Sequence, residues 1–166
     1  MGVMAKTVYI ETTIPSAYYD DRDNLVSRFQ RQQTRLWWRV HRIAYELLTS
    51  ESVIVELSGP GFAKGAECLR LLRGLPVLTV DDEIRGVAEV HVKHLVMPRG
   101  FMGDSFYLAF ASVHEVDYLL TWNCQHLANP FKVAHITAIN RRLGLLTPMI
   151  LTPQMLVEET TREEKN

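Results

Sequence analysis

The sequence has few cysteines, little net charge and no long hydrophobic run. Two cysteines among 166 residues, with no CxxC pair, argue against a disulfide framework and a structural zinc site, and they fit a reducing compartment. The 18 basic and 19 acidic residues nearly cancel, so any nucleic-acid-binding surface must be local. No apolar run approaches the roughly 20 residues that span a bilayer. We therefore expect a cytoplasmic protein with no membrane partner.

The length and composition are those of one globular domain. A chain of 166 residues is ordinary for one domain and short for two. Its 47% hydrophobic and 22% charged residues are typical of globular proteins. No repeat, low-complexity tract or long linker divides it. We expect a single domain over residues 1–166, with its core at about 6–151 and a short, polar, frayed tail at 160–166.

Short apolar strands alternate with helical segments along the chain. The runs at 8–10, 77–80 and 118–121 read as buried strands. This alternation predicts an α/β fold, a three-layer α/β/α sandwich with a central parallel sheet. Sites in such folds lie outside the carboxyl ends of the strands, which points to the residues after Ile10 and Leu120. Helices are expected at residues 31–48, 53–57, 62–72, 82–95, 103–114 and 133–143, with a loop at 97–100.

The expected helix at 31–48 has two different faces. Arg35, Trp38, Arg42 and Tyr45 cluster on the side predicted to point outward. Interleaved aromatic and arginine side chains can stack bases and neutralise phosphates. They can equally anchor a second subunit or a protein partner, or pack against another part of the chain. The opposite stripe, expected to face the core, consists of Leu36, Val40, Ile43, Ala44 and Leu47.

Acidic and amide side chains stand at the predicted strand ends and helix starts: Glu11, Glu56, Asp104 and Asn123. Carboxylates brought together from distant segments repel one another unless a cation neutralises them. Hard oxygen ligands select Mg²⁺ or Mn²⁺, and such a site hydrolyses phosphodiesters by orienting a water. Taken singly, each residue has an ordinary alternative as a solvated loop residue, a helix cap or a turn residue.

Four short segments carry a resemblance to a known family. In order, residues 8–13, 50–57, 103–109 and 118–123 resemble the landmarks of PIN domains, which include the VapC-type toxin ribonucleases of toxin–antitoxin pairs. The likeness covers about residues 6–151. It implies a parallel-sheet α/β/α fold and Mg²⁺- or Mn²⁺-dependent cleavage of single-stranded RNA. It also implies an antitoxin as protein partner, alongside the homodimer considered above.

The resemblance also implies roles for individual residues. Glu11, Glu56 and Asp104 correspond to metal-binding acids, which with Asn123 would form the catalytic group. Thr13 and Thr121 correspond to supporting polar residues.

Two positions depart from the family pattern. The family usually has Asp where this chain has Glu11, whose carboxylate lies one methylene further out. Asn123 stands at the place of a fourth acid and carries no charge. Asp117 precedes its strand and is expected at the opposite end. Two functions therefore remain open: a toxin-like endoribonuclease, or a PIN-fold module that binds RNA or protein with weak or lost nuclease activity.

Overall fold

The structure, a computed structural model, describes residues 4–94 and 103–165. Within those residues the chain forms a five-stranded parallel sheet with strand order β3-β2-β1-β4-β5. The predicted loop at 97–100 lies outside the described residues. The strands are β1 (Lys6–Ile10), β2 (Tyr45–Ser50), β3 (Val77–Leu78), β4 (Tyr118–Leu120) and β5 (Met149–Leu151).

The central strand β1 is buried on both faces. Val8, Tyr9 and Ile10 are fully buried, and β1 pairs with β2 on one side and with β4 on the other. A strand with this environment reads as an unbroken apolar run, which is why its sequence signal is clear. The strands predicted near β1, β3 and β4 are confirmed, whereas β2 and β5 were not predicted from the sequence.

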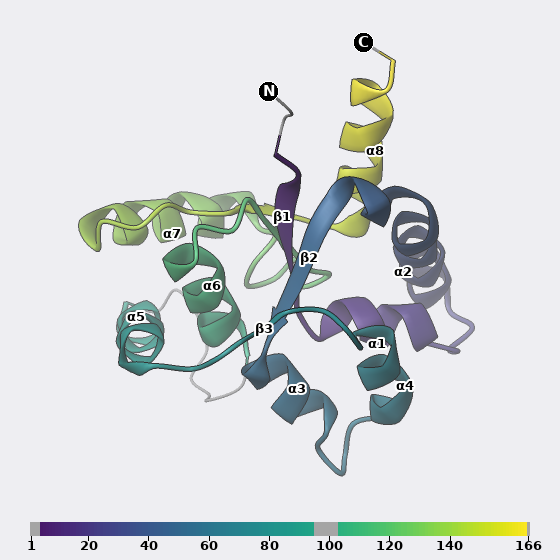
Figure 1. Ribbon diagram of the computed structural model, residues 1–166, viewed down its shortest axis with the longest axis horizontal. Coiled ribbons are helices and arrows are strands. Elements are labelled where there is room, and N and C mark those ends of the chain that lie inside the picture. Colours follow the sequence, from purple (N-terminus) through teal and green to yellow (C-terminus); the bar gives the residue numbers. More distant parts are fainter. Residues whose placement is uncertain (1–3, 95–102, 166) are drawn as a thin grey trace.

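Helices cover both faces of the sheet (Figure 1). In Figure 1, α5, α6 and α7 lie on one side of the sheet and α1, α2 and α8 lie on the other. The predicted three-layer α/β/α architecture is therefore confirmed. The helices are α1 (Thr13–Tyr19), α2 (Leu25–Leu36), α3 (Glu51–Leu57), α4 (Gly65–Leu71), α5 (Asp82–Lys93), α6 (Asp104–Val113), α7 (Pro130–Arg142) and α8 (Pro153–Glu163).

The layer formed by α5, α6 and α7 contains a buried polar network. His91 Nε2 and Asn140 Oδ1 are 2.8 Å apart, and the Asn140 amide donates to Ser112 Oγ at 3.0 Å. All three side chains are fully buried. These contacts join the three helices and fix the position of α6, which begins at the candidate site.

The prediction of one helix at 31–48 is wrong, both in the length of the helix and in which side chains face the core. Helix α2 ends at Leu36, a π-helical turn follows at Trp37–His41, and a 3₁₀ turn at Arg42–Ala44 leads into β2. The wider turn shifts the angular position of every later side chain. As a result Trp38 is 6% exposed, whereas Ile43 of the predicted core stripe is 92% exposed.

The carboxyl-terminal segment is helical rather than frayed. Thr152 caps α8 by accepting a hydrogen bond from Met155 N, and Leu156 is fully buried. The side chain of Thr160 is bonded to the hydroxyl of Tyr45 at 2.6 Å. The prediction of a frayed tail at 160–166 is therefore wrong at least as far as Glu163, the last residue of α8. This helix packs on β2 and β4 through Thr160 and Glu159.

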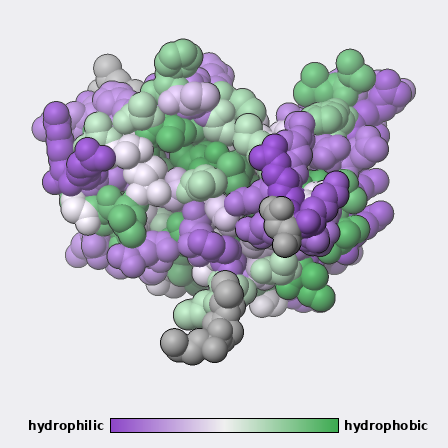
Figure 2. Space-filling view, turned by 90° about the horizontal axis from the view of Figure 1, so that it is seen from above, coloured by the Kyte–Doolittle hydropathy of each residue, from purple (hydrophilic) through white to green (hydrophobic). Residues whose placement is uncertain are grey.

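The start of β1 and the end of α8 lie at the same end of the molecule, away from the carboxyl ends of β1 and β2 (Figure 1). Seen from that end, hydrophilic side chains cover most of the surface and hydrophobic residues emerge in separate patches (Figure 2). Among the described residues, no helix is long and apolar enough to cross a membrane.

Candidate active site at the carboxyl edge of the sheet

Parallel strands bring the predicted acids to one edge of the sheet. Glu11 follows β1 directly, and Asn123 follows β4, which pairs with β1. Helix α3 starts immediately after β2, where the Ser50 hydroxyl caps it, and it carries Glu56 towards the same edge. Asp104 is the first residue of α6. Adjacent parallel strands end on the same side, so the chain's topology delivers these side chains to a common region.

Glu11 is a buried acid with a strongly perturbed pKa. Glu11 is only 1% exposed. Its Oε1 accepts hydrogen bonds from the backbone N–H of Thr13, at 2.9 Å, and from the Thr13 hydroxyl. The pKa of Glu11 is raised to about 8, first by burial and then by the negative charges of Asp104 and Glu56, against the hydrogen bonds from Thr13, which lower it. The three carboxyl groups are therefore close enough to influence one another electrostatically.

Asp104 is paired with Asn123. The Asn123 amide nitrogen donates to Asp104 Oδ2 at 2.8 Å, while its oxygen accepts from the backbone N–H groups of Gln125 and His126. Thr121 supports the turn by accepting from Asn123 N at 2.9 Å. Burial raises the pKa of Asp104, with Asn123 and His126 acting against it. The two N–H donors fix the amide orientation, so Asn123 presents a donor rather than an oxygen ligand to Asp104.

Two residues that the sequence analysis did not identify hold Glu56. The Tyr107 hydroxyl donates to Oε2, and the Thr12 hydroxyl donates to Oε1 at 3.3 Å. Tyr107 is 1% exposed, and its burial raises the pKa of its hydroxyl. A signal existed in the sequence: Tyr107 lies three residues after Asp104 on the same helix face, and Thr12 directly follows Glu11.

Thr13 connects the ends of two strands. Its hydroxyl donates to Glu11 and accepts from the backbone N–H of Trp122 at 2.8 Å. Thr13 and Asn123 also line a pocket of about 290 Å³, together with Gln30 and Trp122 among others. Thr13 thus contacts Glu11, and Thr121 contacts the turn that carries Asn123. Both positions suit the supporting role that the resemblance to PIN domains implies.

The ligand types fit a hard divalent cation, but the acids do not surround a single point. The negative charges of Asp104 and Glu56 help to raise the pKa of Glu11, and Glu56 helps to raise that of Asp104, so a cation would neutralise this group. Within residues 4–94 and 103–165, however, no three His, Cys, Asp or Glu side chains are arranged so that they could hold a metal ion. Their oxygens instead accept hydrogen bonds from Thr13, Tyr107 and Asn123. A bound cation would have to displace part of this network.

The predicted substrate or partner face is not a single face. Trp38 is buried, and Tyr45 lies on β2 with its hydroxyl against Thr160. The guanidinium of Arg35 lies 5.3 Å from the ring centre of Tyr18, and that of Arg42 lies 5.0 Å from the ring of Trp38. Both aromatic residues therefore make contacts within the chain, although Tyr45 is only partly buried and lines a pocket together with Arg42.

Comparisons with known proteins give likenesses to solved structures alone. No protein-family model matches the chain. No curated protein is significantly similar to it. A chain in the crystal structure of VapBC2 from Rickettsia felis, bound to a DNA fragment from its promoter, is similar over 88% of this chain and 98% of that chain. The identity is 11% and the TM-score 0.48. A likeness at this level assigns no activity, ligand or partner.

Proposed function

We propose that this chain is a metal-dependent endoribonuclease that hydrolyses phosphodiester bonds of single-stranded RNA, of the kind that serves as the toxin of a toxin–antitoxin pair. The observation that carries the proposal is the group of acids at the carboxyl edge of the sheet, where mutual repulsion contributes to the raised pKa of Glu11. Buried acids with shifted pKa values in a common region are typical of catalytic sites. The RNA substrate rests on the resemblance of four sequence segments to PIN domains.

Glu11, Glu56 and Asp104 would hold Mg²⁺ or Mn²⁺ once their side chains give up part of the hydrogen-bond network in which the structure holds them. When bound, such a cation would neutralise the charge that develops on the phosphate and on the leaving oxygen. Without it, Glu11 keeps its proton at neutral pH because its pKa is about 8. Cation binding should therefore release a proton and strengthen as the pH rises towards 8.

The neighbouring residues act as positioning residues in this proposal. Thr13 holds one oxygen of Glu11, and Tyr107 with Thr12 holds both oxygens of Glu56. Asn123 orients Asp104 by donating to Oδ2. These contacts hold the acids at one edge of the sheet before a cation arrives, and the cation would replace some of them.

Cleavage by two site variants tests the proposal. Glu11→Gln and Asp104→Asn remove a charge with little change in size, so we expect each to lower cleavage of a fluorescent single-stranded oligoribonucleotide in Mn²⁺ by roughly 100-fold or more. Asp117→Asn removes the same charge at the opposite edge of the sheet and should cleave at the wild-type rate. Undiminished cleavage by both site variants would refute the assignment.

A second candidate function is an RNA- or protein-binding module with weak or lost cleavage. Asn123 favours it, because at the place of the family's fourth acid it carries no charge and donates an amide N–H to Asp104 Oδ2. Under this reading the wild-type chain binds the oligoribonucleotide but leaves it intact in Mn²⁺. An antitoxin partner, a homodimer and a cytoplasmic location remain predictions from the sequence.

A further inference from the structure

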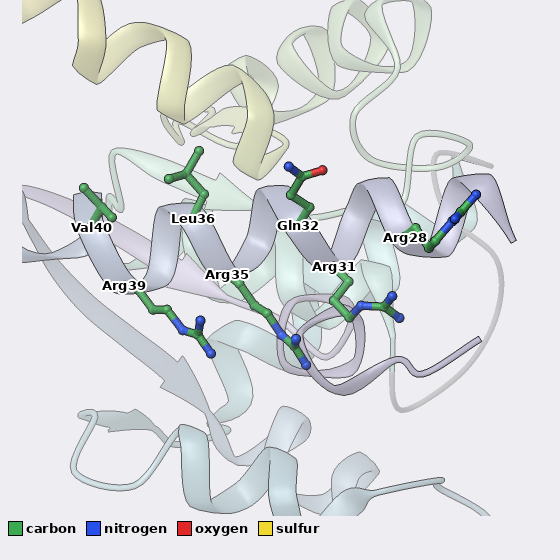
Figure 3. Close-up of a pocket in the computed structure, with 7 residues that line it drawn as sticks. All are labelled: Arg28, Arg31, Gln32, Arg35, Leu36, Arg39 and Val40. Carbon is green, nitrogen blue, oxygen red and sulfur yellow. The ribbon is translucent and has the colours of Figure 1, made fainter. Parts of the chain in front are cut away.

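Three arginines form a row along α2 and the π-helical turn that follows it. Arg31, Arg35 and Arg39, here called the arginine ladder, are four residues apart, which places them on one side of the helix at intervals of about 6 Å. Figure 3 shows their side chains on one side and those of Leu36 and Val40 on the other. All five residues line a pocket of about 520 Å³.

The ladder is ordered by neutral groups. Arg31 Nη1 donates to the backbone carbonyl of Asp20, Arg35 Nε donates to the carbonyl of Tyr18 at 2.9 Å, and Arg39 Nε donates to the Tyr18 hydroxyl at 3.2 Å. The guanidinium groups of Arg35 and Arg39 also lie 5.3 Å and 5.7 Å from the centre of the Tyr18 ring. These contacts restrict the side chains without neutralising them.

The positive charges of the ladder have no carboxylate partner. Among the residues that the structure describes, the ion pairs join Lys6 to Asp117, Arg22 to Asp20, Arg28 to Asp23 and Lys64 to Asp21, and none includes a ladder arginine. Pre-ordered guanidinium groups with unneutralised charge are suited to phosphate, which their planar donors can bind in pairs. The ladder therefore resembles a prepared anion-binding surface.

One end of the ladder lies next to the pocket beside the candidate active site. Arg31 contacts Asp20, and Asp20 lines the smaller pocket that also includes Thr13 and Asn123. Trp122 lines the same pocket and lies edge-on against Phe29 of α2, with 6.2 Å between the ring centres. Thr13 and Asn123 of this pocket contact Glu11 and Asp104, so the acids, the aromatic pair and the arginines are neighbours, a combination typical of single-strand binding surfaces.

We propose that the arginine ladder binds the phosphates of the single-stranded RNA next to the bond that is cut. This inference rests on the proposed function, and it supplies the local basic surface that the net charge of the chain does not reveal. An acidic protein partner is the competing occupant, since Leu36, Val40 and Ile43 are 39%, 58% and 92% exposed. RNA is favoured because Arg31, at one end of the ladder, contacts Asp20, which lines the pocket beside the candidate site.

RNA binding at several salt concentrations tests the ladder. The measurement uses fluorescence anisotropy of a labelled single-stranded oligoribonucleotide with Asp104→Asn protein in EDTA, so binding is read without cleavage. Each phosphate contact on a single strand contributes about 0.7 to the slope of log K against log salt, so Arg35→Gln with Arg39→Gln should make the slope shallower by about 1.4. Affinity at low salt should fall with it.

Two matched variants separate charge from packing. Arg141→Gln with Arg142→Gln removes the same charge from exposed positions in the last turn of α7, and should leave both slope and affinity unchanged. Arg35→Lys with Arg39→Lys keeps the charge and should retain the slope. Circular dichroism and a thermal melt on each variant establish that it is folded before its binding is compared.

Two results would overturn the proposal. One is that the Arg35→Gln, Arg39→Gln variant binds RNA with the same affinity and salt slope as the Arg141/Arg142 control. The ladder would then be a surface for a protein partner and not for RNA. The other is a folded Lys variant that loses slope as the Gln variant does, which would show that packing against Tyr18 and not charge is responsible. Neither result bears on cleavage, and absent cleavage in the wild-type chain would not change the slope comparison.

Discussion

The two ends of the parallel sheet treat their acidic residues in opposite ways. At the amino end, Asp117 Oδ2 accepts from the backbone N–H and the hydroxyl of Thr7, at 2.9 and 3.0 Å, and Lys6 Nζ lies 3.5 Å from Oδ1. These donors, the Thr7 N–H first, hold the pKa of Asp117 below its usual range. At the carboxyl end, burial raises the pKa of Glu11 and of Asp104.

The difference shows which end is arranged for stability. An acid that is ionised and hydrogen-bonded in the folded state stabilises it, whereas buried acids that repel one another reduce stability. The carboxyl edge keeps such acids next to a pocket, as is common where binding or catalysis requires a charge arrangement that folding alone would not favour. The comparison can be sharpened by changing one acid at each end.

The largest effect on stability is expected from Glu11. Its pKa rises from an ordinary 4.5 to about 8 on folding, so between these values the folded state binds more protons than the unfolded state. The contribution to the free energy of unfolding is therefore full below pH 4.5 and is lost as the pH rises to 8. Glu11→Gln does not titrate, and near pH 8 it should be more stable than wild type by on the order of a few kcal/mol.

Urea unfolding of both proteins between pH 5 and pH 8.5, in EDTA, measures this effect. The difference in free energy of unfolding between Glu11→Gln and wild type should widen with pH and then level off near pH 8. Parallel curves over this range would mean that Glu11 is ionised in the folded protein at all these pH values, which would remove the electrostatic contrast between the two ends of the sheet.

A smaller effect of opposite sign is expected from Asp117. Asp117→Ala removes the acceptor of two hydrogen bonds from Thr7 and should lower the free energy of unfolding at pH 7 by about 1–2 kcal/mol. Because the pKa of Asp117 is lowered on folding, its contribution is present above pH 3.8 and is lost as the pH falls through its folded pKa. Urea unfolding at pH 7 and pH 3 checks both statements, and equal losses at the two values would contradict the second.

Local sequence signals predicted the strand segments that are buried without interruption. The run at Val8–Ile10 and the run at Tyr118–Leu120 are continuous apolar segments, and they became β1 and β4. Strand β2 was missed because apolar residues repeat at helical spacing from the end of α2, through the π-helical and 3₁₀ turns, into β2 itself. These residues are Leu36, Val40, Ile43 and Leu47. The π-helical turn, and the burial of Trp37 and Trp38, follow from packing against other elements and leave no periodic pattern in the sequence.

The candidate site was predictable as a set of residues but not as a set of contacts. Topology alone carries Glu11, Glu56, Asp104 and Asn123 to one edge of the sheet. The hydrogen bond from Tyr107 to Glu56 depends on how α6 is rotated against α3, which a single sequence does not specify. The direction of the Asn123 amide depends likewise on the turn that follows β4.

The most direct test of the account is Mn²⁺ binding measured by calorimetry at pH 8.5. We predict that the wild-type chain and Asp117→Asn bind Mn²⁺ alike, and that Glu11→Gln and Asp104→Asn each bind it roughly tenfold more weakly or worse. Equal Mn²⁺ affinity in all four proteins, or no binding by the wild-type chain, would contradict the claim that the acids at the carboxyl edge act together on a divalent cation.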